Sequence, residues 1–165
     1  MDDSVVRSMA KWPDVPDVYG WLSLDRRGNW LLRSTGATPK FERIGNAALR
    51  EFISRNYQAD ARGCWYFQNG PQRVFVALAY TPLVVHFEGA ALIDQCGRPF
   101  SPAQAFLDEE GSVLFSGSPG AALLDDRDLA HFAERAEGLP QVQSAAVASR
   151  FHFVQEPCAA PKSSL

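Results

Sequence analysis

One predicted hairpin carries side chains that suit the binding of a small molecule. The strand-forming segments 64–69 and 72–80 flank the turn residues Gly70 and Pro71. A tight turn here places four side chains on one face, namely Tyr66, Gln68, Arg73 and Phe75. An aromatic floor beside an amide and a guanidinium suits an anionic or planar ligand. The alternative is a half-buried second layer in which Arg73 pairs with a carboxylate.

Other polar residues give weaker indications of chemistry. Asp125, Asp126 and Asp128 form an acidic cluster that a divalent cation could use. Carboxylates at the start of a helix also cap backbone donors, and we favour this interpretation. His86 and His131 have no Cys, His or carboxylate at metal-ligand spacing. The sequence therefore predicts no metal site and no cofactor.

The motifs of the commonest enzyme classes are absent from the sequence. It contains no G-x-x-x-x-G-K-[S/T] loop, no G-x-G-x-x-G after a strand, no H-E-x-x-H and no G-x-S-x-G. This absence argues against the usual nucleotide-binding, zinc-protease and hydrolase sites. Many active sites are assembled from scattered residues, so enzymatic activity stays open, although we lean against it.

The elements that must position these residues follow from turn and cap signals. A hairpin is expected over 18–33 around the turn Asp25-Arg26-Arg27-Gly28, and another around 108–111. Helices are expected over 47–57, capped by Asn46, and over 127–137, capped by Asp125 or Asp126. The expected class is α+β: a curved antiparallel sheet of about seven to eight strands built from hairpins, with two amphipathic helices packed on it.

The chain divides into three expected parts. Pro13 and Pro16 disfavour a helix, so residues 1–17 are expected to form an extended N-terminal arm. Residues 18–155 are expected to form a single α+β domain, and residues 156–165 a disordered tail. The chain of 165 residues is long enough to bury a sizeable core.

An eight-residue pattern occurs twice. Residues 24–31 and 107–114 both read L-D-x-x-G-x-x-L, and a capped amphipathic helix is expected after each copy. The simpler interpretation is a hairpin turn that recurs, because Asp and Gly suit the same turn positions everywhere. The alternative is a duplicated strand-strand-helix unit.

Charge is unevenly distributed along the chain. The formal net charge is −3, but residues 1–82 hold 11 basic and 8 acidic residues, whereas residues 83–165 hold 5 basic and 11 acidic ones. No nucleic-acid recognition motif accompanies the basic half, so no nucleic-acid partner is expected. Opposite patches favour contact between copies of the chain, and a homo-oligomer, most simply a dimer, is expected. Trp21 and Trp30 are the candidate interface residues, because aromatic side chains are expected on both faces of the hairpins.

Location is predicted from the absence of membrane and export signals. The longest apolar run, 74–85, is interrupted by Pro82 and is shorter than the roughly 20 residues of a membrane span. The first residues lack the basic and apolar regions of a signal peptide. We therefore expect no membrane association, a cytoplasmic location and three free cysteines.

Three segments resemble a known group of sequences. Residues 19–30, 65–74 and 125–129 are similar to segments of a small uncharacterised family of bacterial, mainly proteobacterial, proteins, over roughly residues 12–140. The resemblance implies a bacterial cytosolic protein and assigns no activity, cofactor or catalytic residue.

The function expected from the sequence is a non-enzymatic binding or interaction module that self-associates. An unidentified protein or a small anionic ligand is the other expected partner. The alternative function is a small-molecule binding protein or an enzyme with a pocket near the 64–80 hairpin. A concave pocket around Arg73 would favour this alternative.

Overall fold

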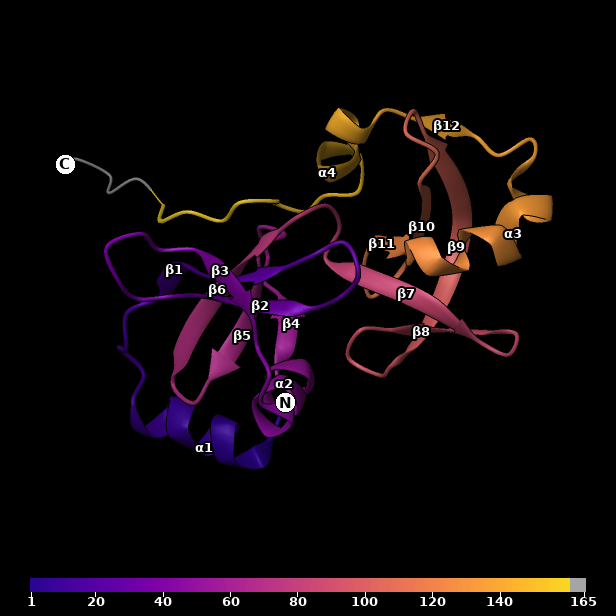
Figure 1. Cartoon of the computed structure of the whole chain (residues 1–165). Coiled ribbons are helices and arrows are strands. Elements are labelled where there is room, and N and C mark those ends of the chain that lie inside the picture. Colours follow the sequence, from indigo (N-terminus) through magenta and orange to yellow (C-terminus); the bar gives the residue numbers. More distant parts are fainter. Residues whose placement is uncertain (161–165) are drawn as a thin grey trace.

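The computed structural model describes residues 1–160, which fold into four α-helices and two six-stranded sheets. Figure 1 shows the two sheets as two lobes, the first with α1 and α2 and the second with α3 and α4. The α+β class is confirmed. The expected single curved sheet is instead divided in two at residues 79–82, where Pro82 has no N–H to continue a strand ladder.

The first lobe is built from two three-stranded meanders joined by a helix. Its strands are β1 (Val18–Leu24), β2 (Trp30–Arg33), β3 (Phe41–Arg43), β4 (Tyr57–Ala59), β5 (Trp65–Asn69) and β6 (Gln72–Leu78). Their order is β3-β2-β1-β6-β5-β4, and the central pair β1 and β6 is parallel. The linking helix α2 (Ala47–Arg55) begins at its predicted cap, because the Asn46 side chain accepts from the Leu49 N–H at 3.0 Å.

The second lobe contains a closed five-stranded barrel. Its strands are β7 (Leu83–Glu88), β8 (Ala91–Asp94), β9 (Pro99–Asp108), β10 (Val113–Ser118), β11 (Ala122–Leu124) and β12 (Gln141–Val142). Strands β7 to β11 run in order around the barrel, which the parallel pairing of β11 with β7 closes. A 3-10 turn, η1 (Asp126–Asp128), leads into α3 (Leu129–Ala136), and a second turn, η2 (Ser144–Ala146), leads into α4 (Val147–Arg150).

Both lobes share one main hydrophobic core. The same buried cluster includes Leu22 and Tyr57 of the first lobe and Leu114 and Phe132 of the second. The Tyr57 hydroxyl also donates to the Pro82 carbonyl at 2.7 Å, at the point where the chain passes between the lobes. Burial of apolar side chains therefore joins the two sheets, which share no strand pairing within residues 1–160.

The N-terminal segment differs from the expected extended arm. Residues 3–11 form α1 (Asp3–Lys11), whose Val5 is only 2% exposed, and the proline-containing segment 12–17 that follows it lacks regular structure. The backbone N–H of Asp2 donates to the Asn56 side chain at 2.8 Å, and its carboxylate pairs with Arg55. Tertiary contacts thus stabilise a helix that the nearby prolines obscured. At the other end, 161–165 of the expected disordered tail lie outside the described residues.

The repeated pattern in the sequence corresponds to a turn that occurs four times. In each turn the Oδ1 atom of an aspartate accepts from the backbone N–H groups two and four residues later, at 2.8 to 3.0 Å. The four aspartates are Asp25, Asp60, Asp94 and Asp108, and the glycine that ends each turn has a φ near +80°. A recurrent local turn therefore accounts for the pattern.

Two of these turns meet between the lobes. Nη2 of Arg26, in the first turn, lies 3.4 Å from Oε2 of Glu110, in the fourth. Some of the opposite charges of the two halves thus pair with each other within one chain. Within residues 1–160, no helix is both long and apolar enough to cross a bilayer.

Candidate functional site

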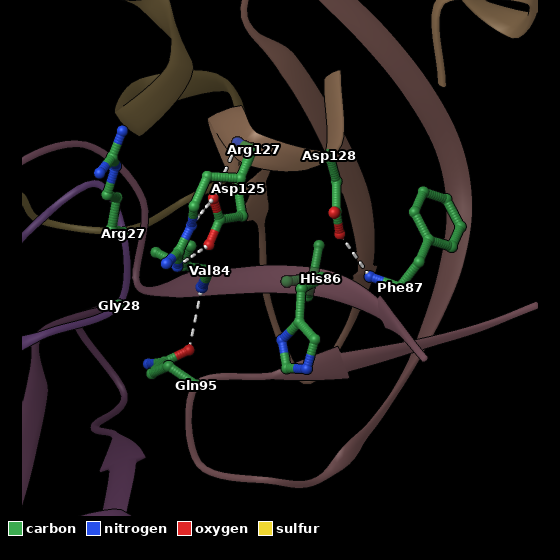
Figure 2. A pocket seen from close by; sticks show the side chains of 10 residues that line it. Arg27, Gly28, Val84, His86, Phe87, Gln95, Asp125, Arg127 and Asp128 are labelled. Atoms are coloured by element: carbon green, nitrogen blue, oxygen red, sulfur yellow. Dashed lines mark hydrogen bonds and ion pairs between the residues drawn. The ribbon is translucent and has the colours of Figure 1, made fainter. Parts of the chain in front are cut away.

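A pocket of about 480 Å³ lies between the lobes. Figure 2 shows Arg27, from the β1–β2 turn, opposite Asp125, which precedes η1, and Arg127 of η1, with His86 of β7 below them. The first lobe thus contributes a cation, and the second lobe contributes charges of both signs.

The charged groups of this interlobe pocket satisfy one another. Arg27 binds both carboxylate oxygens of Asp126, at 3.0 and 3.1 Å. Nε of Arg127 donates to Asp125 at 2.9 Å, and Asp128 accepts from the backbone N–H of Phe87 at 2.7 Å. The ion pairs and hydrogen bonds at this pocket therefore connect the two lobes, and the charged groups of the pocket already have protein partners.

Capping explains only part of the acidic cluster. Asp125 caps η1 by accepting from the Arg127 N–H at 2.9 Å. Burial opposes ionisation of Asp125, but hydrogen bonds from the Arg127 side chain and backbone outweigh it and lower its pKa. Asp126 and Asp128 instead join other elements, since they bind Arg27 and β7. No group of three or more candidate metal ligands occurs in the part of the chain that the structure describes.

The structure brings the four predicted ligand-binding residues together on one face of the β5–β6 hairpin. Tyr66 pairs across the hairpin with Phe75, and Gln68 pairs with Arg73. A second layer covers part of this face, because Tyr19 stacks on Phe75 with ring centroids 4.8 Å apart. Tyr66 and Phe75 are consequently buried in a small aromatic cluster and do not form an open floor.

Arg73 lies on this face without an acidic partner. Its guanidinium carbon is 4.5 Å from the centroid of the Tyr66 ring, a cation–π contact. No ion pair joins its half-buried side chain to a carboxylate of residues 1–160. The ion pair expected in the alternative interpretation is therefore not formed within residues 1–160, although Asp17 lines the same pocket and the second layer itself is present.

Arg73 and Gln68 line a pocket of about 380 Å³. The end of α1 and the segment 12–17 form one wall, and the hairpin turn forms the other. The other lining residues are Met9, Trp12, Pro13, Val15, Asp17 and Pro71. Sequence reasoning did not assign Trp12 or Asp17 to a site, since no local signal indicates that the segment lies against a hairpin more than 50 residues away.

Gln68 has an unsatisfied polar atom beside this pocket. The side chain is nearly inaccessible, with 1% of the residue exposed. Its Nε2 donates to the Gly70 carbonyl at 3.0 Å, whereas its Oε1 is buried without a donor. A buried acceptor without a partner costs roughly 1–3 kcal/mol, so such atoms are uncommon in folded proteins.

The two candidate interface residues have different environments. Trp30 is 2% exposed, and its Nε1 donates to the Ser54 hydroxyl at 3.2 Å, so it belongs to the core. Trp21 is 44% exposed and borders an apolar groove of about 220 Å³, together with Leu32 and Leu49. Trp30 pairs with the buried Leu24 across the first hairpin, whereas Trp21 lies in the part of β1 where the register shifts between Val18 and Leu22.

Comparison with known proteins identifies a family but no activity. The DUF2944 family, described as "Protein of unknown function (DUF2946)", matches residues 1–155, which confirms the expected relation to an uncharacterised family. No curated protein matches the chain significantly.

Two crystal structures of DUF1285 family proteins resemble the chain at 15% sequence identity. The protein from Silicibacter pomeroyi has a TM-score of 0.49, and the match covers 81% of this chain and 85% of that one. The protein from Shewanella baltica has a TM-score of 0.47, with 68% and 90% covered. The names of these structures state no ligand, partner or reaction.

Proposed function

We propose that this chain, which belongs to the DUF2944 family of proteins of unknown function, binds a small anionic ligand. The binding site is the pocket between the segment 12–17 and the β5–β6 hairpin, which we call the hairpin pocket. The observation that carries the proposal is the half-buried guanidinium of Arg73, which lines this pocket and has no carboxylate partner in the described chain.

The contrast with the interlobe pocket supports this choice. There, Arg27 and Arg127 are each bound by an aspartate, so an incoming anion would have to displace a carboxylate of the protein. In the hairpin pocket, an anion would meet a guanidinium whose donors are free of acidic partners. The cation–π contact with Tyr66 also limits the motion of the guanidinium, which reduces the entropy lost when a ligand binds.

A thermal-shift comparison of benzoate with benzamide tests the proposal. The two molecules have the same planar ring and differ in the charge of the substituent. A ligand that binds only the native state raises the melting temperature by mass action. Benzoate should raise it and benzamide should not. Equal shifts, or no shift with benzoate, acetate or inorganic phosphate, would contradict anion binding.

Self-association is the second candidate function, and the exposed apolar groove favours it. Trp21, Leu32 and Leu49 are each at least 36% exposed around the groove. A second copy of the chain would bury these side chains, and a homodimer is the simplest closed assembly. Light scattering after gel filtration should give the dimer mass, and Trp21→Ser should give the monomer mass. A wild-type monomer at all accessible concentrations would contradict this candidate.

The compartment that we propose for this activity is the cytoplasm. The three cysteines, Cys64, Cys96 and Cys158, are free thiols, which supports a reducing environment.

A further inference from the structure

The hairpin pocket has flat walls in addition to its cation. The indole of Trp12 is 56% exposed, and Pro13 and Pro71 supply two further rings to the lining. Nζ of Lys11 lies 5.6 Å from the centroid of the Trp12 ring and adds positive charge at this wall. Flat apolar walls bury a planar ring more completely than a bulky, saturated group.

The unsatisfied Oε1 of Gln68 adds a requirement for a hydrogen-bond donor. It is an acceptor, so a ligand that satisfies it must present an N–H or O–H group. Gln68 and Arg73 face each other directly across the hairpin. The Cβ atoms of such cross-strand pairs lie about 5 Å apart. A single small ring with an N–H beside a carboxylate can therefore reach both side chains.

The end of α1 and the segment 12–17 form the wall beside Gln68, and a ligand reaches the buried Oε1 only where this wall shifts. Pro13 and Pro16 contribute no backbone N–H, and Gln72 Nε2 binds the Pro16 carbonyl at 3.2 Å. This exposed hydrogen bond is easily exchanged for one to water, so the segment can move at small cost.

We infer that the ligand is a planar heteroaromatic acid, with its carboxylate on Arg73 and its ring N–H on the Oε1 of Gln68. This inference rests on the proposed function, to which it adds the chemical class of the ligand. Gln68 is then the specificity-determining residue, because it distinguishes acids with a ring N–H from those without one.

Pyrrole-2-carboxylate and furan-2-carboxylate provide a matched pair of probes. They have the same size and charge, and the ring N–H of the first is replaced by oxygen in the second. Isothermal titration of the full chain should give about tenfold tighter binding of the pyrrole acid, as expected for one buried hydrogen bond. Gln68→Met preserves an unbranched side chain and should bind both acids equally.

The outcomes separate the two proposals. Equal binding of both acids by the wild type, with binding lost in Arg73→Gln, would overturn the role of Gln68 and leave anion binding intact. If neither acid binds, the inference about the ligand class is overturned. If benzoate, acetate and phosphate also do not bind, the proposed function is overturned. If Gln68→Met does not fold, the wild-type comparison of the two acids still decides the question.

Discussion

The guanidinium carbon of Arg73 lies 4.5 Å from the centroid of the Tyr66 ring, on a hairpin face that the N-terminal segment partly covers. The aromatic ring orients the cation, and the pocket beside it contains no carboxylate bound to it. The proposed function, anion binding, depends on this arrangement of Arg73. The arrangement also shows how a residue placed by local hairpin geometry acquires its environment from a distant part of the chain.

We expect the aspartate turns to contribute unequally to stability. Asp108 is 2% exposed and accepts from the Tyr80 hydroxyl at 2.8 Å in addition to its two turn N–H groups. Asp108→Ala should therefore lower the free energy of unfolding by roughly 2–4 kcal/mol, because the buried Tyr80 hydroxyl and two partly buried turn N–H groups lose their acceptor. Asp60→Ala should lower it by about 1 kcal/mol. Urea unfolding measures both values, and equal losses would contradict the ranking.

We expect the ion pairs between the lobes to be weak and sensitive to salt. Arg26 and Glu110 are about half-exposed, as are Arg27 and Asp126. Solvent and counter-ions screen such pairs. A double-mutant cycle with Arg27→Met and Asp126→Asn should give a small coupling energy at low salt that disappears at high salt. A coupling energy that high salt leaves unchanged would show that the contact is not mainly electrostatic.

The three cysteines should differ in reactivity. Burial raises the pKa of the Cys96 thiol to about 12 and raises that of Cys64 above its usual value. Because the thiolate is the reactive form, both should resist iodoacetamide near pH 8.5, whereas the exposed Cys158 should be alkylated. Mass mapping of the native and unfolded protein checks this order. Rapid native labelling of Cys96 would contradict its burial.

The raised pKa of Cys96 also predicts how stability changes in alkali. The native thiol keeps its proton up to about pH 12, whereas the unfolded thiol ionises near pH 9. Unfolding therefore releases a proton in this interval, and the Cys96 contribution falls as the pH rises from about 9 to about 12. Cys96→Ala should lose less stability than the wild type between pH 8 and pH 10. Identical losses in urea unfolding would exclude this contribution.

Local signals predicted the hairpins and the helices α2 and α3. Gly70 and Pro71 form the expected tight turn, with Phe67 opposite Val74, and Asn46 caps α2 as expected. These features depend on a few adjacent residues, and turn or cap chemistry is strong over such distances.

The division into two sheets depends on contacts that a single sequence does not reveal. The parallel pairs β1–β6 and β7–β11 join segments that are far apart in the chain. Helix α1 was missed because Pro13 and Pro16 lie just after it, although neither lies within it. The face with Gln68 and Arg73 was predictable because it depends on the local geometry of one hairpin. The wall that covers it was not predictable, because it comes from a segment far away in the chain.

Binding of an anion to Arg73 is tested most directly by isothermal titration of pyrrole-2-carboxylate into three proteins. These are the wild type, Arg73→Gln and the control Arg33→Gln, which removes an exposed arginine on β2. A hydrogen-bonded charge pair is worth roughly 1.5–3 kcal/mol, so Arg73→Gln should bind about tenfold to a hundredfold more weakly than the wild type. Arg33→Gln should bind like the wild type. Unchanged affinity in Arg73→Gln would contradict the account.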